Sequence, residues 1–165
     1  GIRQPTMYSW PGTFEPAHRM DLINSIDIFP TVLAAVGARQ PKIKVPGLNL
    51  LPQLENGSAI SRDAIFGESF AHDIPDIENP EASLLFRWCI RGDWKLLLTY
   101  DGEVNRYKTT HPRDDKRPQL FNLKNDPHEN TNLAGENPRV VARMAKMIND
   151  WWPVRERKVL IEFNL

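Results

Sequence analysis

Two apolar stretches lie in the middle of the chain, at residues 84–90 and 94–100, and only Arg91-Gly92-Asp93 separates them. Short apolar runs joined by a glycine-containing turn are typical of a β-hairpin. We therefore predict two antiparallel strands here. Side chains alternate between the two faces of a strand, so one face should carry every second residue of the first run: Leu84, Phe86, Trp88 and Ile90.

Three further segments have the apolar content and flanking turn residues of strands. They are residues 1–10, 64–70 and 118–123. The loop between residues 71 and 81 is polar and acidic, and residues 101–117 are strongly charged. We expect both of these segments to run over the surface.

Helical spacing of apolar residues marks the two ends of the chain. Residues 25–37 form the first predicted helix, capped by Ser25 or Asp27 and ended by Gly37. One face of it should carry Phe29, Val32, Leu33 and Val36. A shorter helical turn is predicted within residues 48–54.

The last helix should begin at Asn137-Pro138, with asparagine as the cap and proline in the first helical position. Its apolar stripe is Val141, Met144, Ile148 and one of the two tryptophans at 151 and 152. These elements predict an α+β fold. In it, a small antiparallel sheet of about four strands is packed by a C-terminal helix.

Composition narrows the functional classes. The chain has 165 residues and equal numbers of acidic and basic side chains, 21 of each. No basic excess is present to neutralise phosphates, so a nucleic-acid partner is not expected. The apolar runs are far shorter than the ~20 residues that span a bilayer, so no membrane span is expected. Cys89 has no cysteine to pair with, and we predict a buried, unreactive thiol.

Few of the histidines and acidic residues are candidates for a metal site or for substrate contact. The four histidines lack the spacing of metal ligands, so no metal site is predicted. Asp126-Pro-His-Glu129 lacks the ligand pattern of a calcium loop and is interpreted as a turn. His72 and Asp73 follow a predicted strand, in a loop of the kind that carries function, and are candidates for substrate contact.

Arginines can bind a sulfate or a carboxylate. Arg87 is a substrate-binding candidate, although a structural role is the other interpretation. For Arg91 we favour a structural ion pair with Glu68, Asp126 or Glu129.

Two further motifs have alternative interpretations. The tryptophans at 151 and 152 could form a platform on which sugars stack, but core packing is favoured for at least one of them. Asn56-Gly-Ser58 matches a glycosylation sequon, but a turn is favoured.

Residues 119–134 read QLFNLKNDPHENTNLA. This order resembles the signature L-[YF]-[DN]-L-x-x-D-P-x-E-x-x-N-L-A near the C-terminus of the type I sulfatases. Residues 1–12, 21–37 and 86–97 resemble three further motifs of the same family, in the family's order. The third of these is the hairpin motif R-x-x-x-x-G-x-[WY]-K-L.

The resemblance implies that the chain is the C-terminal portion of a formylglycine-dependent sulfatase in the alkaline-phosphatase-like superfamily. Residues 1–60 would be a strand–helix remnant of the α/β catalytic domain, and residues 61–165 the C-terminal subdomain. The formylglycine precursor of the family, in a C/S-x-P-x-R motif, and the calcium ligands are not found in this sequence. Cys89 is followed by Ile-Arg-Gly, which does not match that motif. No catalytic residue is therefore assigned.

The expected function is hydrolysis of a sulfate ester, on a sulfated small molecule or carbohydrate, by the full-length enzyme. This portion alone should be inactive. Two alternatives stay open: a phosphodiesterase or phosphonate hydrolase of the same superfamily, and a non-catalytic module that binds sulfated carbohydrate. Family members are often periplasmic, extracellular or lysosomal, so the resemblance implies an exported protein.

Overall fold

The computed structural model describes residues 4–39, 41–43, 45–70, 78, 80–99 and 117–154. The chain divides into two compact units, Gly1–Arg62 and Asp63–Leu165. The boundary expected from the sequence, between residues 60 and 61, lies within two residues of this division. Each unit is described by itself.

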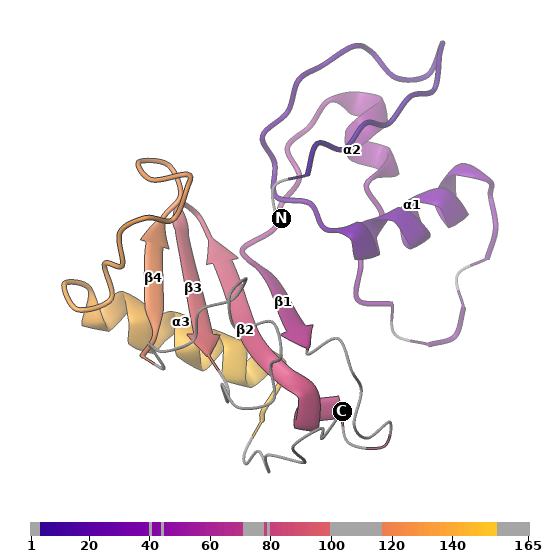
Figure 1. The fold of residues 1–165 in the computed structure, drawn as a ribbon. Helices are drawn as coiled ribbons and strands as arrows, with labels where there is room; N and C mark the ends of the chain where they lie inside the picture. Colours follow the sequence, from indigo (N-terminus) through magenta and orange to yellow (C-terminus); the bar gives the residue numbers. More distant parts are fainter. Residues whose placement is uncertain are drawn as a thin grey trace, which may run out of the picture. The chain divides into compact units, whose positions relative to one another are not determined.

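The second unit is built on a four-stranded antiparallel sheet (Figure 1). Its strands are β1 (Ile65–Phe70), β2 (Leu84–Arg91), β3 (Trp94–Thr99) and β4 (Gln119–Asn122), and they lie in the sheet in sequence order. A short 3₁₀ helix, η2 (Pro80–Ser83), precedes β2. The predicted antiparallel sheet is confirmed, and the strand ends differ from the predicted ones by one residue.

The hairpin between β2 and β3 is closed by two residues. Arg91 is the partner of Trp94, so Gly92 and Asp93 form the turn. Gly92 has a φ of +55°, a left-handed conformation that glycine adopts without a Cβ clash. The sequence Arg91-Gly92-Asp93 therefore sets the register of the central strand pair.

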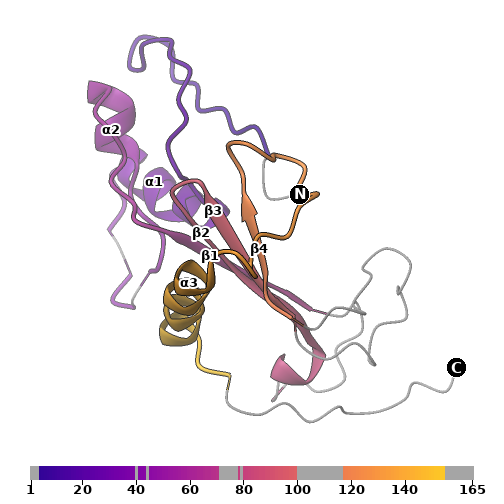
Figure 2. The ribbon, with the colours of Figure 1, turned by 90° about the vertical axis from the view of Figure 1, so that its left-hand side faces the viewer.

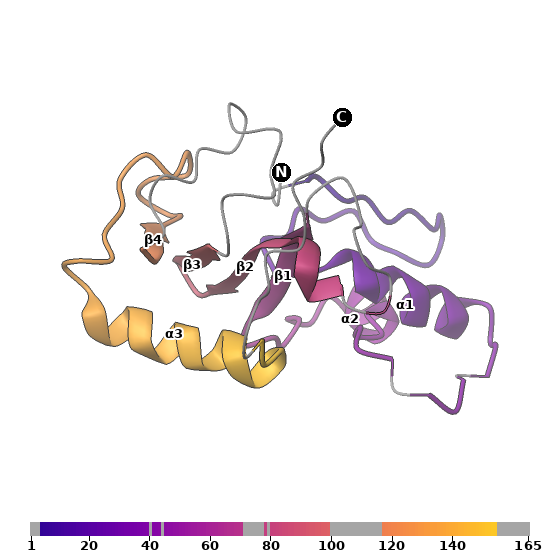
Figure 3. The same cartoon turned by 60° about the horizontal axis from the view of Figure 1, so that its bottom comes forward.

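Helix α3 (Pro138–Trp151) covers one face of the sheet (Figures 2 and 3). Met144 and Ile148 are almost completely buried and pack against three side chains of the sheet: Cys89, Leu96 and Leu120. Pro138 is the first helical residue, as predicted, but the Asn137 side chain does not cap the helix. Asn137 instead donates a hydrogen bond to the Leu133 carbonyl.

Trp88, the neighbour of Cys89 on β2, points to the opposite face of the sheet. Trp88 is paired with Gly67 of β1, and its indole lies over that glycine. A Cβ on Gly67 would lie 2.2 Å from the ring. A side chain larger than hydrogen at position 67 would therefore displace Trp88.

The first unit contains η1 (Ser25–Asp27), α1 (Ile28–Ala35) and α2 (Leu51–Asn56). Asn24 caps the first turn, because its side chain accepts from the Ile26 N–H while the Asp27 carboxylate accepts from the Asn24 N–H. Asp27, one of the two predicted caps, occupies the N-cap position of α1, but its side chain makes no capping hydrogen bond to that helix. Gly37, with a φ of +65°, follows the helix as predicted.

The apolar face of α1 is largely exposed within this unit. Phe29, Val32 and Val36 are exposed at 53%, 51% and 70% of their surface, whereas Pro30 and Thr31 are buried. Three of the four residues predicted for this face are therefore exposed, and the fourth, Leu33, is half-buried.

The strand predicted at residues 1–10 is not present in its described part. Residues 4–10 are neither helical nor in a sheet, and most of them are exposed. A strand needs a neighbouring strand to pair with its backbone groups, and the described part of this unit contains no sheet.

The sequon-like motif forms a turn at the end of α2. Gly57 has a φ of +72°, and its N–H donates to the Gln53 carbonyl. The Asn56 side chain accepts a hydrogen bond of 2.8 Å from the Ser58 N–H. The favoured interpretation of this motif as a turn is confirmed.

Candidate functional site

The sulfatase-like signature, residues 119–134, forms β4 and the loop that returns from it to α3. Asn122 closes the first turn, because its side chain accepts from the Asn125 N–H at 3.1 Å. The backbone carbonyl of the same residue accepts from the Asp126 N–H at 2.8 Å. The asparagine of the signature therefore serves to reverse the chain after β4.

Asp126 holds the next turn. Its carboxylate accepts from the Thr131 N–H at 2.9 Å and from the Asn130 side-chain amide at 3.2 Å. These hydrogen bonds, led by the one from Thr131, lower the pKa of Asp126 below its usual value. The Asp-Pro segment is thus a turn held by a carboxylate, as predicted.

Glu129 links this loop to the sheet. Its carboxylate is 2.5 Å from the ammonium group of Lys95, a residue of β3 with only 8% of its surface exposed. Glu129 has a φ of +58°, an uncommon conformation for a residue other than glycine. The ion pair holds this strained turn against the sheet.

Asn132 closes the outer edge of β4. Its side-chain oxygen accepts from the backbone N–H groups of Leu120 and Ala134, both at 3.0 Å. The Leu133 N–H donates to the Leu120 carbonyl at 2.8 Å. An edge strand with open backbone groups invites pairing with other chains. The signature therefore covers this edge and positions the start of α3.

Arg87 is the candidate that the structure describes most fully. It lies on β2 with 1% of its surface exposed. One terminal nitrogen of its guanidinium donates to the Trp152 carbonyl, and the other donates to the Asn149 side chain at 2.7 Å. Burial lowers the pKa of Arg87.

This arginine therefore binds the C-terminal end of α3, where backbone carbonyls lack helical partners. Its observed partners are a backbone carbonyl and a side-chain amide. A direct contact between Arg87 and substrate stays a prediction.

The other substrate-binding candidates, His72 and Asp73, lie outside the described residues. Arg91 forms the predicted kind of structural ion pair, at 2.9 Å, but its partner is Asp63 and not one of the three carboxylates named from the sequence. Asp63 was missed because it precedes β1, and only the pairing of β1 with β2 brings it to Arg91.

Cys89 does not fit a formylglycine precursor. Its side chain is fully buried beneath α3, and burial raises the pKa of its thiol to about 12. Within the described ranges, no group of three or more His, Cys, Asp or Glu side chains could hold a metal ion. The described residues thus fit neither of the two groups that the sulfatase resemblance implies.

Sequence reasoning missed a buried carboxylate in the first unit. Asp27 is completely buried, accepts from the Leu48 N–H at 2.8 Å, and lies 2.5 Å from the guanidinium of Arg62. Burial, and secondarily the charge of Asp27, raise the pKa of Tyr8. The spacing Asn24-x-x-Asp27 resembles a capping box and could have indicated this carboxylate.

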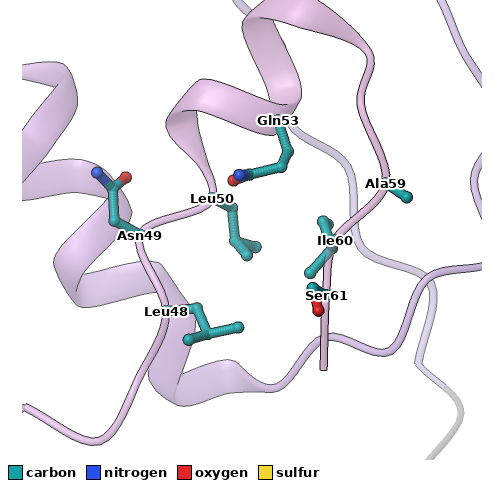
Figure 4. Close-up of a pocket in the computed structure, with 7 residues that line it drawn as sticks. All are labelled: Leu48, Asn49, Leu50, Gln53, Ala59, Ile60 and Ser61. Atoms are coloured by element: carbon teal, nitrogen blue, oxygen red, sulfur yellow. The ribbon is translucent and has the colours of Figure 1, made fainter. Parts of the chain in front are cut away.

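A small cavity of about 200 Å³ lies beside α2 in the same unit. Figure 4 shows Leu50 and Gln53 pointing into it from the start of α2, with Ile60 and Ser61 on the facing segment. Its walls carry aliphatic, amide and hydroxyl groups and no ionisable side chain. This cavity can bind water or a small neutral group, but it holds no nucleophile or general base.

No protein-family model matches the chain. Among curated proteins, it is 32% identical over 142 residues to arylsulfatase A of Bos taurus, covering 81% of this chain and 26% of that protein. It is 25% identical over 150 residues to the N-acetylgalactosamine-6-O-sulfatase of Bacteroides thetaiotaomicron, covering 90% of this chain and 27% of that protein. The chain belongs to the sulfatase family and spans about a quarter of the length of these curated relatives.

Solved structures agree with the sulfatase fold. One, from work on glycosaminoglycan metabolism by Bacteroides thetaiotaomicron, has a TM-score of 0.65 and 25% identity, covering 86% of this chain and 27% of that one. The phosphonate monoester hydrolase of Agrobacterium radiobacter has a TM-score of 0.53 and 25% identity, covering 75% of this chain and 23% of that one. This chain thus spans about a quarter of the length of these two proteins.

Proposed function

We propose that this chain is the C-terminal subdomain, with an adjoining piece of the catalytic domain, of an enzyme that hydrolyses sulfate esters. The observation that carries this proposal is the match to curated sulfatases over 81% and 90% of this chain. The match includes the signature loop. In the structure, the side chains of Asn122, Asp126 and Asn132 in this loop accept backbone hydrogen bonds.

The division of the chain into Gly1–Arg62 and Asp63–Leu165 supports this assignment of parts. The first unit, with its open apolar face on α1, would belong to the α/β catalytic domain. The second unit, with a sheet covered by one helix, would be the subdomain.

Catalysis would rest on groups outside the described residues. Sulfate ester cleavage needs a nucleophile and positive charge near the sulfuryl oxygens. In the full-length enzyme we expect formylglycine and a calcium ion to supply them. The part of this chain that the structure describes would position substrate through neighbouring loops and would not cleave it.

His72, Asp73 and Arg87 are the residues we propose for substrate contact. Arg87 would act mainly by holding the end of α3, because its guanidinium already binds Trp152 and Asn149. The substrate class would be a sulfated small molecule or carbohydrate, and the enzyme would be exported.

The test compares this chain with the longer protein that contains it, on 4-nitrophenyl sulfate, with a heat-inactivated sample as background. We expect turnover by the longer protein and none by the 165-residue chain. Turnover by this chain alone would contradict the proposal.

A phosphonate monoester hydrolase is the second candidate, because a solved structure of that activity shares the fold at 25% identity. The same pair of samples should be assayed on 4-nitrophenyl phenylphosphonate. A longer protein that cleaves the phosphonate faster than the sulfate would establish this second candidate. Cleavage of neither ester, with binding of sulfated oligosaccharide retained, would establish a non-catalytic module.

A further inference from the structure

The turn at the end of α2 contains a pair of residues with chemistry of its own. Asn56, Gly57 and Ser58 are all exposed in this chain. Of all the asparagines in the sequence, Asn56 alone is followed by a glycine. The backbone nitrogen next to the Asn56 carboxamide therefore has no Cβ beside it to hinder its approach. This arrangement favours a reaction of the asparagine side chain with the backbone that follows it.

The Asn56 carbonyl is held in a position that assists such a reaction. Its Oδ1 atom accepts a hydrogen bond of 2.8 Å from the Ser58 N–H. When a nucleophile adds to a carbonyl, the oxygen gains negative charge, and a fixed N–H donor stabilises that charge. The Ser58 N–H therefore acts on the same oxygen that would become negative during attack at Cγ.

The nucleophile, in contrast, is restrained. The Gly57 N–H donates to the Gln53 carbonyl at 3.1 Å, and Gly57 is the residue that ends α2. Attack on Asn56 requires this hydrogen bond to open. Helix ends open readily, and α2 is only six residues long. The frequency of opening therefore sets the rate of reaction.

Arg19 holds this turn closed from both sides. One terminal nitrogen of its guanidinium donates to the Gln53 carbonyl at 2.9 Å, and the other donates to the Ser58 carbonyl at 2.5 Å. Its Nε atom lies 2.8 Å from the carboxylate of Asp21, which also accepts from the Ile60 N–H at 3.0 Å. We name the contacts of Arg19 with residues 53, 58 and 21 the Arg19 clamp.

We propose that Asn56 is a site of spontaneous deamidation in this chain, at a rate limited by the Arg19 clamp. The Gly57 nitrogen attacks Asn56 Cγ and forms a new N–Cγ bond. The Cγ–Nδ2 bond breaks, and Nδ2 leaves as ammonia with the proton that the Gly57 nitrogen loses. Water then opens the cyclic imide at one of its two carbonyls, giving aspartate or isoaspartate. No electrons are transferred, and water is the only co-reactant.

Both products alter the end of α2. Aspartate places a negative charge at the C-terminal end of a helix, where the helix dipole disfavours it. Isoaspartate lengthens the backbone between Asn56 and Gly57, so the Gly57 N–H is displaced from the Gln53 carbonyl. Deamidation therefore loosens the segment that the Arg19 clamp holds.

The experiment incubates the full chain at neutral pH and physiological temperature for several weeks. Mass spectrometry of peptides measures conversion at each asparagine, and labelling with an isoaspartate methyltransferase identifies the isoaspartate product. We expect Asn56 to convert roughly tenfold or more faster than any other described asparagine, because the adjacent nucleophile is unhindered and the oxygen is already bound by a donor. Faster conversion of another described asparagine overturns the proposal.

Two variants test the two parts of the proposal in opposite directions. Arg19→Ala should accelerate conversion severalfold, because the turn opens more often without the clamp. Gly57→Ala should slow it roughly tenfold, because a methyl group then hinders the attacking nitrogen. Unfolding of a variant would speed the reaction and could not imitate this slowing. An unchanged rate in either variant overturns the proposal.

Ser58→Ala and Arg143→Ala are the matched controls. Ser58→Ala keeps the backbone N–H that binds Asn56, and Arg143 is an exposed arginine of α3 in the other unit. Both should convert Asn56 at the original rate, and circular dichroism should show that each variant stays folded. Acceleration by Arg143→Ala equal to that by Arg19→Ala would overturn the role of the clamp. None of these results depends on whether the longer protein hydrolyses sulfate esters.

Discussion

Two carboxylates, Asp126 and Asp27, hold segments of backbone in place. Asp126 accepts hydrogen bonds from its own loop, and Asp27 binds a backbone N–H from residue 48 together with the guanidinium of Arg62. The environments differ, because Asp27 is completely buried and Asp126 is near the surface. The two positions therefore predict different responses to substitution.

Asp126→Asn should reduce the acid dependence of stability. The folded-state pKa of Asp126 lies below its unfolded value, so its contribution is complete above that unfolded value of about 4. The contribution disappears as the pH falls through the folded pKa. Urea unfolding followed by tryptophan fluorescence should show a less stable variant at pH 7 and a smaller difference between the two proteins at pH 3. An equal difference at both pH values would contradict this role for the carboxylate.

Asp27→Ala should destabilise the first unit by about 3–5 kcal/mol, because it leaves the Arg62 guanidinium buried without its ion-pair partner. Asp63→Ala is the matched control, since it breaks the ion pair with Arg91, in which the Asp63 side chain is 69% exposed. The control should cost about 0–1 kcal/mol. Chemical denaturation of the two variants measures both values. Equal losses of unfolding free energy in the two variants would show that burial does not make the Asp27 ion pair more important than the exposed one.

Helix α3 supplies the side chains that complete the hydrophobic core of the second unit. Its stripe of Met144 and Ile148 packs on one residue each from β2, β3 and β4. The alternation of β2 places Cys89 under the helix and Trp88 on the other face. The helix stripe was predicted from its spacing, but the identity of the sheet residues beneath it depends on strand order.

Ile148→Ala should cost about 2–5 kcal/mol, because the side chain is fully buried and its removal leaves a cavity under α3. Arg143→Ala, at an exposed position of the same helix, should change stability by less than about 0.5 kcal/mol. Thermal and urea unfolding give both differences. A small effect at Ile148 would show that α3 is not the main cover of the sheet.

At the level of the whole chain, the two units differ in how much apolar surface they bury. Among the described residues, the exposed large apolar side chains of the first unit outnumber those of the second. They include Phe29 and Val32 of α1, and Val36 at its C-cap. Exposed apolar faces are typical of surfaces made to contact another part of a protein. The proposed origin of this unit in a larger catalytic domain accounts for that surface.

Hydrogen exchange should distinguish the units. Amides of α1 (Ile28–Ala35) should exchange before those of the hairpin formed by β2 and β3, because few apolar contacts protect this helix. Mass spectrometry of peptides from each region, on a sample shown to be monomeric, measures the difference. Equal protection of α1 and the hairpin would mean that the chain behaves as one complete domain.

The local pattern of residues predicted most of the second unit. Alternation and turn chemistry are local properties, so the β2–β3 hairpin, β4, the start of α3 at Pro138 and the turn at Asp126 could be deduced from neighbouring residues. The order of motifs also indicated the family. Cys89 could be named as a buried thiol, because it lies in an apolar run. For Arg87 the sequence left two interpretations, substrate contact and a structural role.

Partners far apart in the sequence could not be deduced in this way. The Arg87 guanidinium meets the end of α3, more than 60 positions later, and Arg62 meets Asp27 at a separation of 35. The strand expected at residues 1–10 depends on a pairing partner that the described part of its unit does not contain. Hydrogen bonds within a turn are set by adjacent residues, whereas strand pairing and buried ion pairs exist only where folding brings distant groups together.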